Sequence, residues 1–104
     1  MKTPEGYEKA DIDRFLKRIP DHIIWYFKPL MAGFGKSGVS DYCLCLCGEF
    51  WSCEVKRPGK DPTAIQDRRM KEVRKAGGYA VAGTADVIIA ELRMALIRHG
   101  IVEY

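Results

Sequence analysis

The chain has no long apolar run. Its strictly apolar stretches, such as those at 23–27, 42–47 and 87–90, are only a few residues long, whereas a membrane-spanning helix needs about 20. The N-terminus also lacks the apolar region of a secretory signal peptide. We therefore expect a cytoplasmic protein that does not associate with a membrane.

The sequence also contains no internal repeat, linker or low-complexity segment. Its 104 residues suit one domain, spanning 1–104, in which folding removes about 65% of the unfolded chain's surface from water. The apolar and charged fractions, 47% and 30%, are ordinary for a globular protein. They exclude a disordered or fibrous class.

No strong overall charge points to a partner, because the net charge is only +3. The charge is concentrated locally instead: residues 56–75 hold eight lysines and arginines against three acidic residues. Such a segment suits a polyanion. A solvated helix face has the same composition, so the segment alone does not decide between the two interpretations.

The four cysteines are poorly placed for a disulfide or a zinc site. Cys43, Cys45 and Cys47 alternate along a predicted strand, where residues two apart are about 6.6 Å from each other and residues four apart about 13 Å. Parallel side chains on one face do not converge as a disulfide requires, and a straight strand cannot gather them into a zinc tetrahedron. We expect these cysteines and Cys53 to be buried free thiols.

Apolar periodicity, caps and breakers predict the helices and strands. Thr3 and Pro4 begin the first helix, Pro20 ends it, and Thr84 is the expected cap of the last helix. Gly48 marks the turn of a β-hairpin. The predicted helices cover 4–18, 63–76 and 84–99, and the predicted strands cover 23–27, 41–47, 50–56 and 79–82.

The glycine-rich segment 31–38 is predicted to be an exposed loop. It contains Gly35-Lys36-Ser37, which is similar to the end of a phosphate-binding P-loop. The first glycine of that motif would fall at Leu30, and a strand follows where the motif needs a helix. A P-loop is therefore excluded, although Lys36 remains available to contact a phosphate.

The predicted hairpin brings Asp41, Glu54 and Lys56 onto one face of the sheet. With Cys47-Gly48 as the turn, Asp41 lies opposite Glu54; with Gly48-Glu49 as the turn, it lies opposite Lys56 and diagonal to Glu54. Both registers keep the three side chains together because side chains alternate with period two. The strand cysteines share this face, so we expect them to form its floor.

Two carboxylates and a lysine at one sheet end are what a metal-dependent phosphodiester hydrolase needs. Mg²⁺ or Mn²⁺ suits the oxygens of Asp41 and Glu54 and the backbone carbonyl of Val55. The metal would polarise the scissile phosphate and lower the pKa of a bound water. Lys56 would orient or deprotonate that water and neutralise charge that develops on the phosphate. Gln66 leads the inward stripe of the helix at 63–76, at the end nearest this group.

The order of these motifs resembles the PD-(D/E)xK nuclease superfamily, and within it the VRR-NUC family in its small stand-alone phage and bacterial form. The matching pieces are Thr3-Pro4-Glu5-Gly6, Gly33-Phe34-Gly35-Lys36-Ser37-Gly38-Val39-Ser40-Asp41, Glu54-Val55-Lys56-Arg57-Pro58-Gly59, Gln66 and Gly77-Gly78. One departure is Ser40, because the family usually has proline before the aspartate. Proline restricts the backbone, so the local geometry of Asp41 needs another source of rigidity.

The resemblance implies an α/β fold: an αβββαβ core with a mixed sheet flanked by helices, plus a C-terminal helix. It implies that Asp41 and Glu54 are metal ligands, that Lys56 is the catalytic lysine, and that Gln66 is the helix-borne glutamine of the family motif. Glu5 matches the acid of the family's first helix, and Glu8 is the other candidate.

The resemblance also implies a DNA endonuclease that acts as a homodimer on branched DNA such as Holliday junctions, in the cytoplasm of a bacterium or a phage-infected host. The helix at 84–99 is apolar over an unusually wide arc, which favours a dimer surface there. A non-catalytic DNA-binding module and a zinc-binding interaction domain are the alternatives. The expected DNA-binding residues are Lys9, Lys36, Arg57, Lys60, Arg68 and Arg69.

Overall fold

A computed structural model describes residues 2–30 and 36–104 of the chain. The glycine-rich loop predicted over 31–38 falls partly outside the described residues, with Gly33, Phe34 and Gly35 among those not described. The elements in chain order are α1 (Pro4–Lys17), β1 (Ile24–Phe27), β2 (Tyr42–Leu46), β3 (Glu49–Val55), α2 (Ala64–Lys75), β4 (Tyr79–Gly83) and α3 (Ala85–Arg98). This order confirms the predicted αβββαβ core with a C-terminal helix.

The four strands form one mixed sheet in the order β1-β2-β3-β4. β1 and β2 are antiparallel, as are β2 and β3, whereas β3 and β4 are parallel. The parallel pair requires a crossover connection, and α2 provides it. The last residues of β3 therefore lie beside the last residues of β4, with Val55 paired to Gly83.

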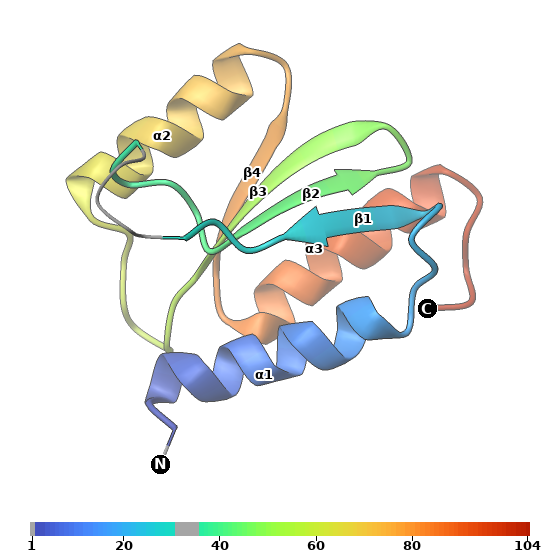
Figure 1. The fold of residues 1–104 in the computed structure, drawn as a ribbon, viewed down its shortest axis with the longest axis horizontal. Coiled ribbons are helices and arrows are strands. Elements are labelled where there is room, and N and C mark those ends of the chain that lie inside the picture. Colours follow the sequence, from blue (N-terminus) through green and yellow to red (C-terminus); the bar gives the residue numbers. More distant parts are fainter. Residues whose placement is uncertain (1, 31–35) are drawn as a thin grey trace.

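The helices cover both faces of the sheet. Figure 1 shows α1 and α3 side by side on one face and α2 on the other. The main core lies under α1 and α3, because alternate residues of β2 and β3 point to that side. The buried side chains there include Ile12, Leu16, Tyr42, Leu44, Leu46, Trp51, Val55, Ile88, Leu92 and Leu96.

The turn of the β2–β3 hairpin selects one of the two predicted registers. Cys47 and Gly48 both have positive φ, 48° and 85°, which is the backbone of a type I′ turn. Leu46 consequently pairs with Glu49, and Tyr42 with Cys53. The next pair outward along this ladder is Asp41 with Glu54.

The helix starts agree with the sequence except at α3. Thr3 accepts a hydrogen bond from the Gly6 N–H at 3.0 Å, as a capping residue should. Thr84 occupies the cap position of α3, but its side chain makes no capping bond. The carboxylate of Glu8 on α1 accepts the hydrogen bond from the Ala85 N–H instead, at 2.8 Å. A tertiary contact has replaced the local cap.

The wide apolar arc predicted for the last helix is mostly buried. Ile88, Leu92, Ala95 and Leu96 all face the core. An exposed apolar stripe remains at Val87, Met94 and Ile97, which are 47%, 64% and 58% exposed. None of the helices formed by the described residues is long and apolar enough to cross a membrane.

A charged cluster joins the start of β3 to the end of α3. The Glu49 carboxylate lies 3.2 Å from the Arg98 guanidinium and 3.3 Å from His99 Nε2. The hydrogen bond from Arg98 is the main cause that lowers the pKa of Glu49 below its usual value of 4.5. Its contribution to stability is therefore present above pH 4.5 and is lost as the pH falls through the lowered pKa.

We expect Glu49→Gln to lower the free energy of unfolding at pH 7 by up to about 1 kcal/mol, the usual range for a partly exposed ion pair. The difference from the unmodified protein should shrink as the pH falls below 4.5 and disappear once the pH is below the lowered pKa of Glu49, because both side chains are then neutral. Urea unfolding between pH 3 and pH 7 measures this. Glu103→Gln, which changes an exposed acid near the C-terminus, is the control, and a difference that does not vary with pH would contradict the assignment.

Candidate active site

Asp41 and Glu54 meet at the end of the β2–β3 ladder. The Asp41 Oδ2 atom accepts a hydrogen bond from the Val55 N–H at 2.8 Å, which fixes the carboxylate against β3. Glu54 is only 4% exposed. The antiparallel register thus places two carboxylates opposite each other at a partly enclosed edge of the sheet, as the parity of the hairpin predicts.

Lys56 lies beside this pair and is also buried. Its Nζ atom is 3.8 Å from Glu54 Oε1, and the two side chains are 7% and 5% exposed. The backbone N–H of Lys56 donates to the Gly83 carbonyl at 2.8 Å. This bond continues the β3–β4 ladder by one residue and keeps the lysine at the sheet edge.

Gln66 connects α2 to the same group. Its Oε1 atom accepts from the Thr63 N–H at 2.9 Å, and the Thr63 hydroxyl accepts from the Gln66 N–H, so the two residues form a capping box. The amide nitrogen of Gln66 then donates to Glu54 Oε1 at 2.9 Å. One side chain both starts the helix and orients the carboxylate.

The protonation of Glu54 reflects this crowding. Burial is the largest cause that raises its pKa to about 8, followed by the negative charge of Asp41 and the hydrogen bond to that carboxyl. Lys56 and Lys9 act in the opposite direction but do not cancel these effects. Two carboxylates this close are costly to ionise together unless a cation accompanies them.

A divalent cation fits this donor set. Among the residues that the structure describes, no group of three or more His, Cys, Asp or Glu side chains is gathered to hold a metal. Mg²⁺, however, is commonly bound by one or two carboxylates, with waters and substrate phosphates completing its coordination. Asp41 and Glu54 form such a pair, and a cation would offset the repulsion between their two negative charges.

The cysteines do not form a metal site either. All four are free, and the expectation that all would be buried is wrong for Cys45, which is exposed, and for Cys47, which is half-buried in the turn. Cys53 faces the opposite side of the sheet, in the main core. Only Cys43 is buried on the face of Asp41, where its sulfur lies 3.9 Å from the Ser40 hydroxyl. The zinc alternative has no support in this arrangement.

Glu5 and Glu8, the two candidates for the acid of the first helix, have different surroundings. Glu8 accepts the hydrogen bond from Ala85 that caps α3, so its carboxylate is already engaged. Glu5 lines a cavity of about 330 Å³ together with Thr3, Pro4, Arg57 and Lys60. Of the two, Glu5 is therefore the acid that shares a cavity with the loop following Lys56.

The other basic residues predicted to bind DNA also differ in their contacts. Arg68 is exposed on α2. Lys36 lies 3.7 Å from a Glu72 carboxylate oxygen. Arg69 is more firmly held, because its Nε donates to the Ser37 carbonyl at 2.8 Å and its guanidinium pairs with Glu72 at 2.9 Å. Lys9 pairs with Asp41 itself, with 3.1 Å between Nζ and Oδ1.

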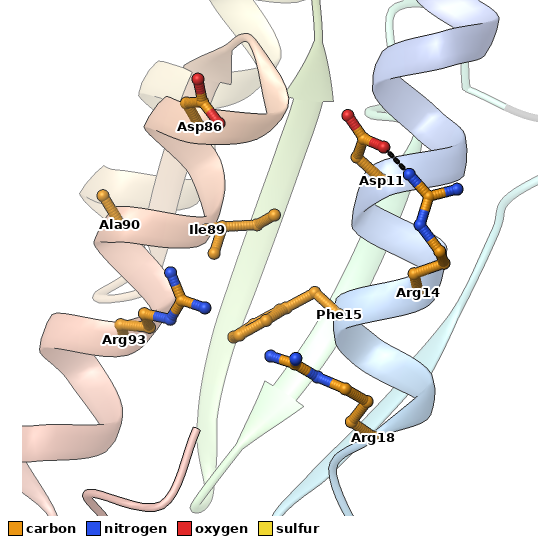
Figure 2. Close-up of a pocket in the computed structure, with 8 residues that line it drawn as sticks. All are labelled: Asp11, Arg14, Phe15, Arg18, Asp86, Ile89, Ala90 and Arg93. Atoms are coloured by element: carbon orange, nitrogen blue, oxygen red, sulfur yellow. Dashed lines mark hydrogen bonds and ion pairs between the residues drawn. The ribbon is translucent and has the colours of Figure 1, made fainter.

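A cavity of about 460 Å³ lies between α1 and α3, away from this group (Figure 2). Arg18 and Arg93 pack over the ring of Phe15, with 5.6 and 5.2 Å from guanidinium carbon to ring centre, and Arg14 pairs with Asp11. None of the predicted site residues lines this cavity. The remaining lining residues are Asp86, Ile89 and Ala90.

Comparison with solved structures identifies similar folds. One, named a VRR_NUC domain, is 25% identical, aligns over 94% of this chain and 98% of its own, and has a TM-score of 0.68. Another, named a VRR_NUC domain protein, is 17% identical, aligns over 90% of this chain and 88% of its own, and has a TM-score of 0.75. The chain has the VRR-NUC fold. No sequence-family model and no curated protein matches it in sequence, so the predicted resemblance is confirmed through structure.

Within the VRR-NUC fold, Ser40 provides the rigidity that the expected proline would have given. Its buried hydroxyl donates to the Tyr42 carbonyl at 2.9 Å and accepts from the Ser52 hydroxyl at 2.7 Å. These bonds hold the backbone on both sides of Asp41. The motif therefore keeps its geometry by hydrogen bonding instead of by a fixed φ angle.

Gly38 also determines the path of the chain that leads to Asp41 in this VRR-NUC fold. Its φ of +76° favours glycine, and a Cβ atom there would lie 2.7 Å from the Ile65 side chain and 2.9 Å from the Ile65 backbone. The chain leading to Asp41 thus passes directly against the start of α2. This contact and the positive φ explain why position 38 is a glycine.

We expect Ser40→Ala to lower the free energy of unfolding by about 1–3 kcal/mol, because it leaves the buried Ser52 hydroxyl without its acceptor. Urea unfolding measures the change. Ser37→Ala, at an exposed serine of the same segment, is the matched control and should change stability by less than about 0.5 kcal/mol. Equal, small effects of both substitutions would show that the Ser40 hydroxyl does not hold the segment.

Proposed function

We propose that the protein is a Mg²⁺- or Mn²⁺-dependent DNA endonuclease that hydrolyses phosphodiester bonds in branched DNA such as Holliday junctions. The observation that carries the proposal is the meeting of Asp41 and Glu54 across β2 and β3, with Lys56 3.8 Å from Glu54. The likeness to two VRR_NUC domains supports a nuclease-type domain. Metal dependence and substrate choice rest on the site chemistry and on the resemblance of the motifs.

In this proposal Asp41, Glu54 and the Val55 carbonyl would hold the metal ion. A bound divalent ion supplies polarisation of the scissile phosphate and a water of lowered pKa. Lys56 orients that water and neutralises negative charge on the phosphate. Gln66 keeps Glu54 directed at the site through its 2.9 Å hydrogen bond.

The DNA backbone would lie along the edge that follows Lys56. Arg57 and Lys60 line the cavity at the start of α1, and Glu5 on the same cavity is the proposed acid of the first helix. Arg68 extends the basic surface over α2, and Lys36 extends it over the segment that precedes β2. Contacts of this kind read backbone shape, which suits selection of a DNA structure over a base sequence.

We expect Lys56→Ala to reduce cleavage of a synthetic four-way junction by about 10²- to 10³-fold, the loss typical when a group that stabilises transition-state charge is removed. Cleavage should require Mg²⁺ or Mn²⁺ and stop with a chelator. Lys75→Ala, at an exposed lysine at the end of α2, is the control. Linear duplex and single strands test the structural preference.

Equal cutting by the Lys56→Ala variant and the unmodified protein would remove Lys56 from the mechanism. Binding of the junction that weakens with salt, without any product in the presence of metal, would instead favour the alternative of a non-catalytic DNA-binding module.

The proposed enzyme is a homodimer formed through α3. The exposed stripe of Val87, Met94 and Ile97 is the apolar surface of that helix that the core does not use. The sheet offers a second apolar surface, because Trp25 and Phe50 are 57% and 46% exposed and both pair in register with Cys45. The α3 stripe is our choice because two-fold packing of a helix on its own copy buries such a stripe symmetrically.

We expect the double variant Met94→Glu, Ile97→Glu to sediment as a folded monomer at concentrations at which the unmodified protein is a dimer. Buried like charges would oppose association, whereas both side chains are exposed in the single chain. Val102→Glu, at another exposed apolar residue outside α3, should leave the dimer intact. Dissociation by Trp25→Glu alone would assign the interface to the sheet.

A further inference from the structure

Both oxygens of the Asp41 carboxylate are engaged within the chain. Oδ2 accepts the hydrogen bond from Val55 N–H at 2.8 Å, and Oδ1 lies 3.1 Å from Lys9 Nζ. Lys9 belongs to α1, so its ammonium group reaches from that helix to Asp41, a carboxylate that we propose binds metal. The two lysines of the site are divided between the two acids, with Lys56 on Glu54 and Lys9 on Asp41.

The position of Lys9 is set by the residue next to Asp41 in sequence. Tyr42 is 1% exposed, and its hydroxyl hydrogen-bonds the Lys9 backbone carbonyl at 3.2 Å and the Asp13 carboxylate at 2.6 Å. Glu8, which precedes Lys9, is tied to the start of α3. The backbone of this turn is thus held from two sides, and Lys9 faces Asp41 because of these tertiary bonds.

The two lysines differ in their freedom to move. The Lys56 side chain is 7% exposed and enclosed by the sheet edge. The Lys9 side chain is 42% exposed, and a lysine ammonium on its flexible stem can leave one partner for another without moving the backbone. Only Lys9 is therefore able to release its carboxylate while the fold stays as it is.

A divalent cation and an ammonium group compete when both require the same carboxylate oxygen. Lys9 supplies positive charge to the acidic pair in the absence of metal, but its charge also opposes a cation that approaches Asp41. Once displaced, the ammonium would remain at the mouth of the site, where a phosphate of the substrate would arrive. The same side chain then has a partner before and after the metal binds.

We propose that Lys9 is an internal counter-ion of the site, which holds Asp41 in the metal-free protein and transfers to a substrate phosphate when the metal is bound. It is a positioning residue in the first state and a phosphate contact in the second. The inference rests on the proposed metal site. It adds that metal binding and DNA binding are linked through one lysine, with effects of opposite sign on the two affinities.

The test compares Lys9→Met with the unmodified protein and with Lys17→Met, which changes an exposed lysine on the same helix. Calorimetric titration with Mn²⁺ alone measures metal affinity without any DNA or turnover. We expect Lys9→Met to bind Mn²⁺ about 5-fold more tightly, the factor that a partly exposed ion pair contributes, and Lys17→Met to be unchanged. Lys9→Arg keeps the charge and should keep the weaker affinity.

The second measurement is binding of a labelled four-way junction in Mn²⁺, made in a Lys56→Ala background so that the DNA stays intact. Adding Lys9→Met should weaken this binding about 5-fold, although the same substitution tightens Mn²⁺. The metal-free variant should also melt at a lower temperature than the unmodified protein, because Asp41 loses its counter-ion.

The outcomes separate this inference from the proposed function. If the unmodified protein binds Mn²⁺ and Lys9→Met binds it equally or more weakly, the counter-ion role is overturned while the metal site stands. If the unmodified protein binds no Mn²⁺ at millimolar concentration, the metal site and the counter-ion role fail together. Tighter Mn²⁺ binding by both Lys9→Met and Lys9→Arg would show that the positive charge of Lys9 does not weaken Mn²⁺ binding, and would overturn the counter-ion role.

Discussion

The enforced proximity of two carboxylates is the constraint on which the rest of the site depends. Asp41 and Glu54 are neighbours because a two-residue turn at Cys47-Gly48 sets the register of the hairpin. Burial is the main cause that raises the pKa of Glu54, and the negative charge of Asp41 adds to the rise. Lys56 and Gln66 at Glu54, and Lys9 at Asp41, offset the cost of ionising both groups.

α1 and α2 each hold one of the two carboxylates. α2 begins at a capping box whose glutamine reaches Glu54, and α1 carries the lysine that reaches Asp41. The two helices lie on opposite faces of the sheet. The acidic pair is therefore held from both faces, by an amide on one side and an ammonium group on the other. The fold thus holds together two carboxyl groups whose negative charges repel each other when both are ionised.

The sequence predicts the central part of this arrangement well, because the period of a strand is a local property. The alternation along β2 and β3 places Asp41, Glu54 and Lys56 on one face in either register, and Gly48 indicates the hairpin itself. Gln66 was also predictable, since helical spacing puts it on the inward stripe next to Met70. Local rules suffice wherever the deciding contact lies within one element or across one turn.

The contacts between distant segments could not be predicted in the same way. Glu8 caps α3 across a separation of 77 residues, whereas the side chain of Thr84, which local rules assign to that task, makes no capping bond. Ser40 accepts a hydrogen bond from Ser52 on the neighbouring strand. Lys9 pairs with Asp41 because of the way α1 packs. Much of the apolar arc of α3 lies in a core whose other half comes from β2 and β3. In each case the partner is fixed by tertiary packing, which a single sequence does not reveal.

Gln66 has a further consequence for the dynamics of the site. Its amide oxygen closes the first turn of α2 and its amide nitrogen donates to Glu54, so the start of the helix and the orientation of the carboxylate depend on the same side chain. Helix termini are among the parts of a protein that open most readily. Fraying of this first turn would therefore loosen one of the contacts that orient Glu54, and amide exchange at the α2 N-terminus measures how often the turn opens.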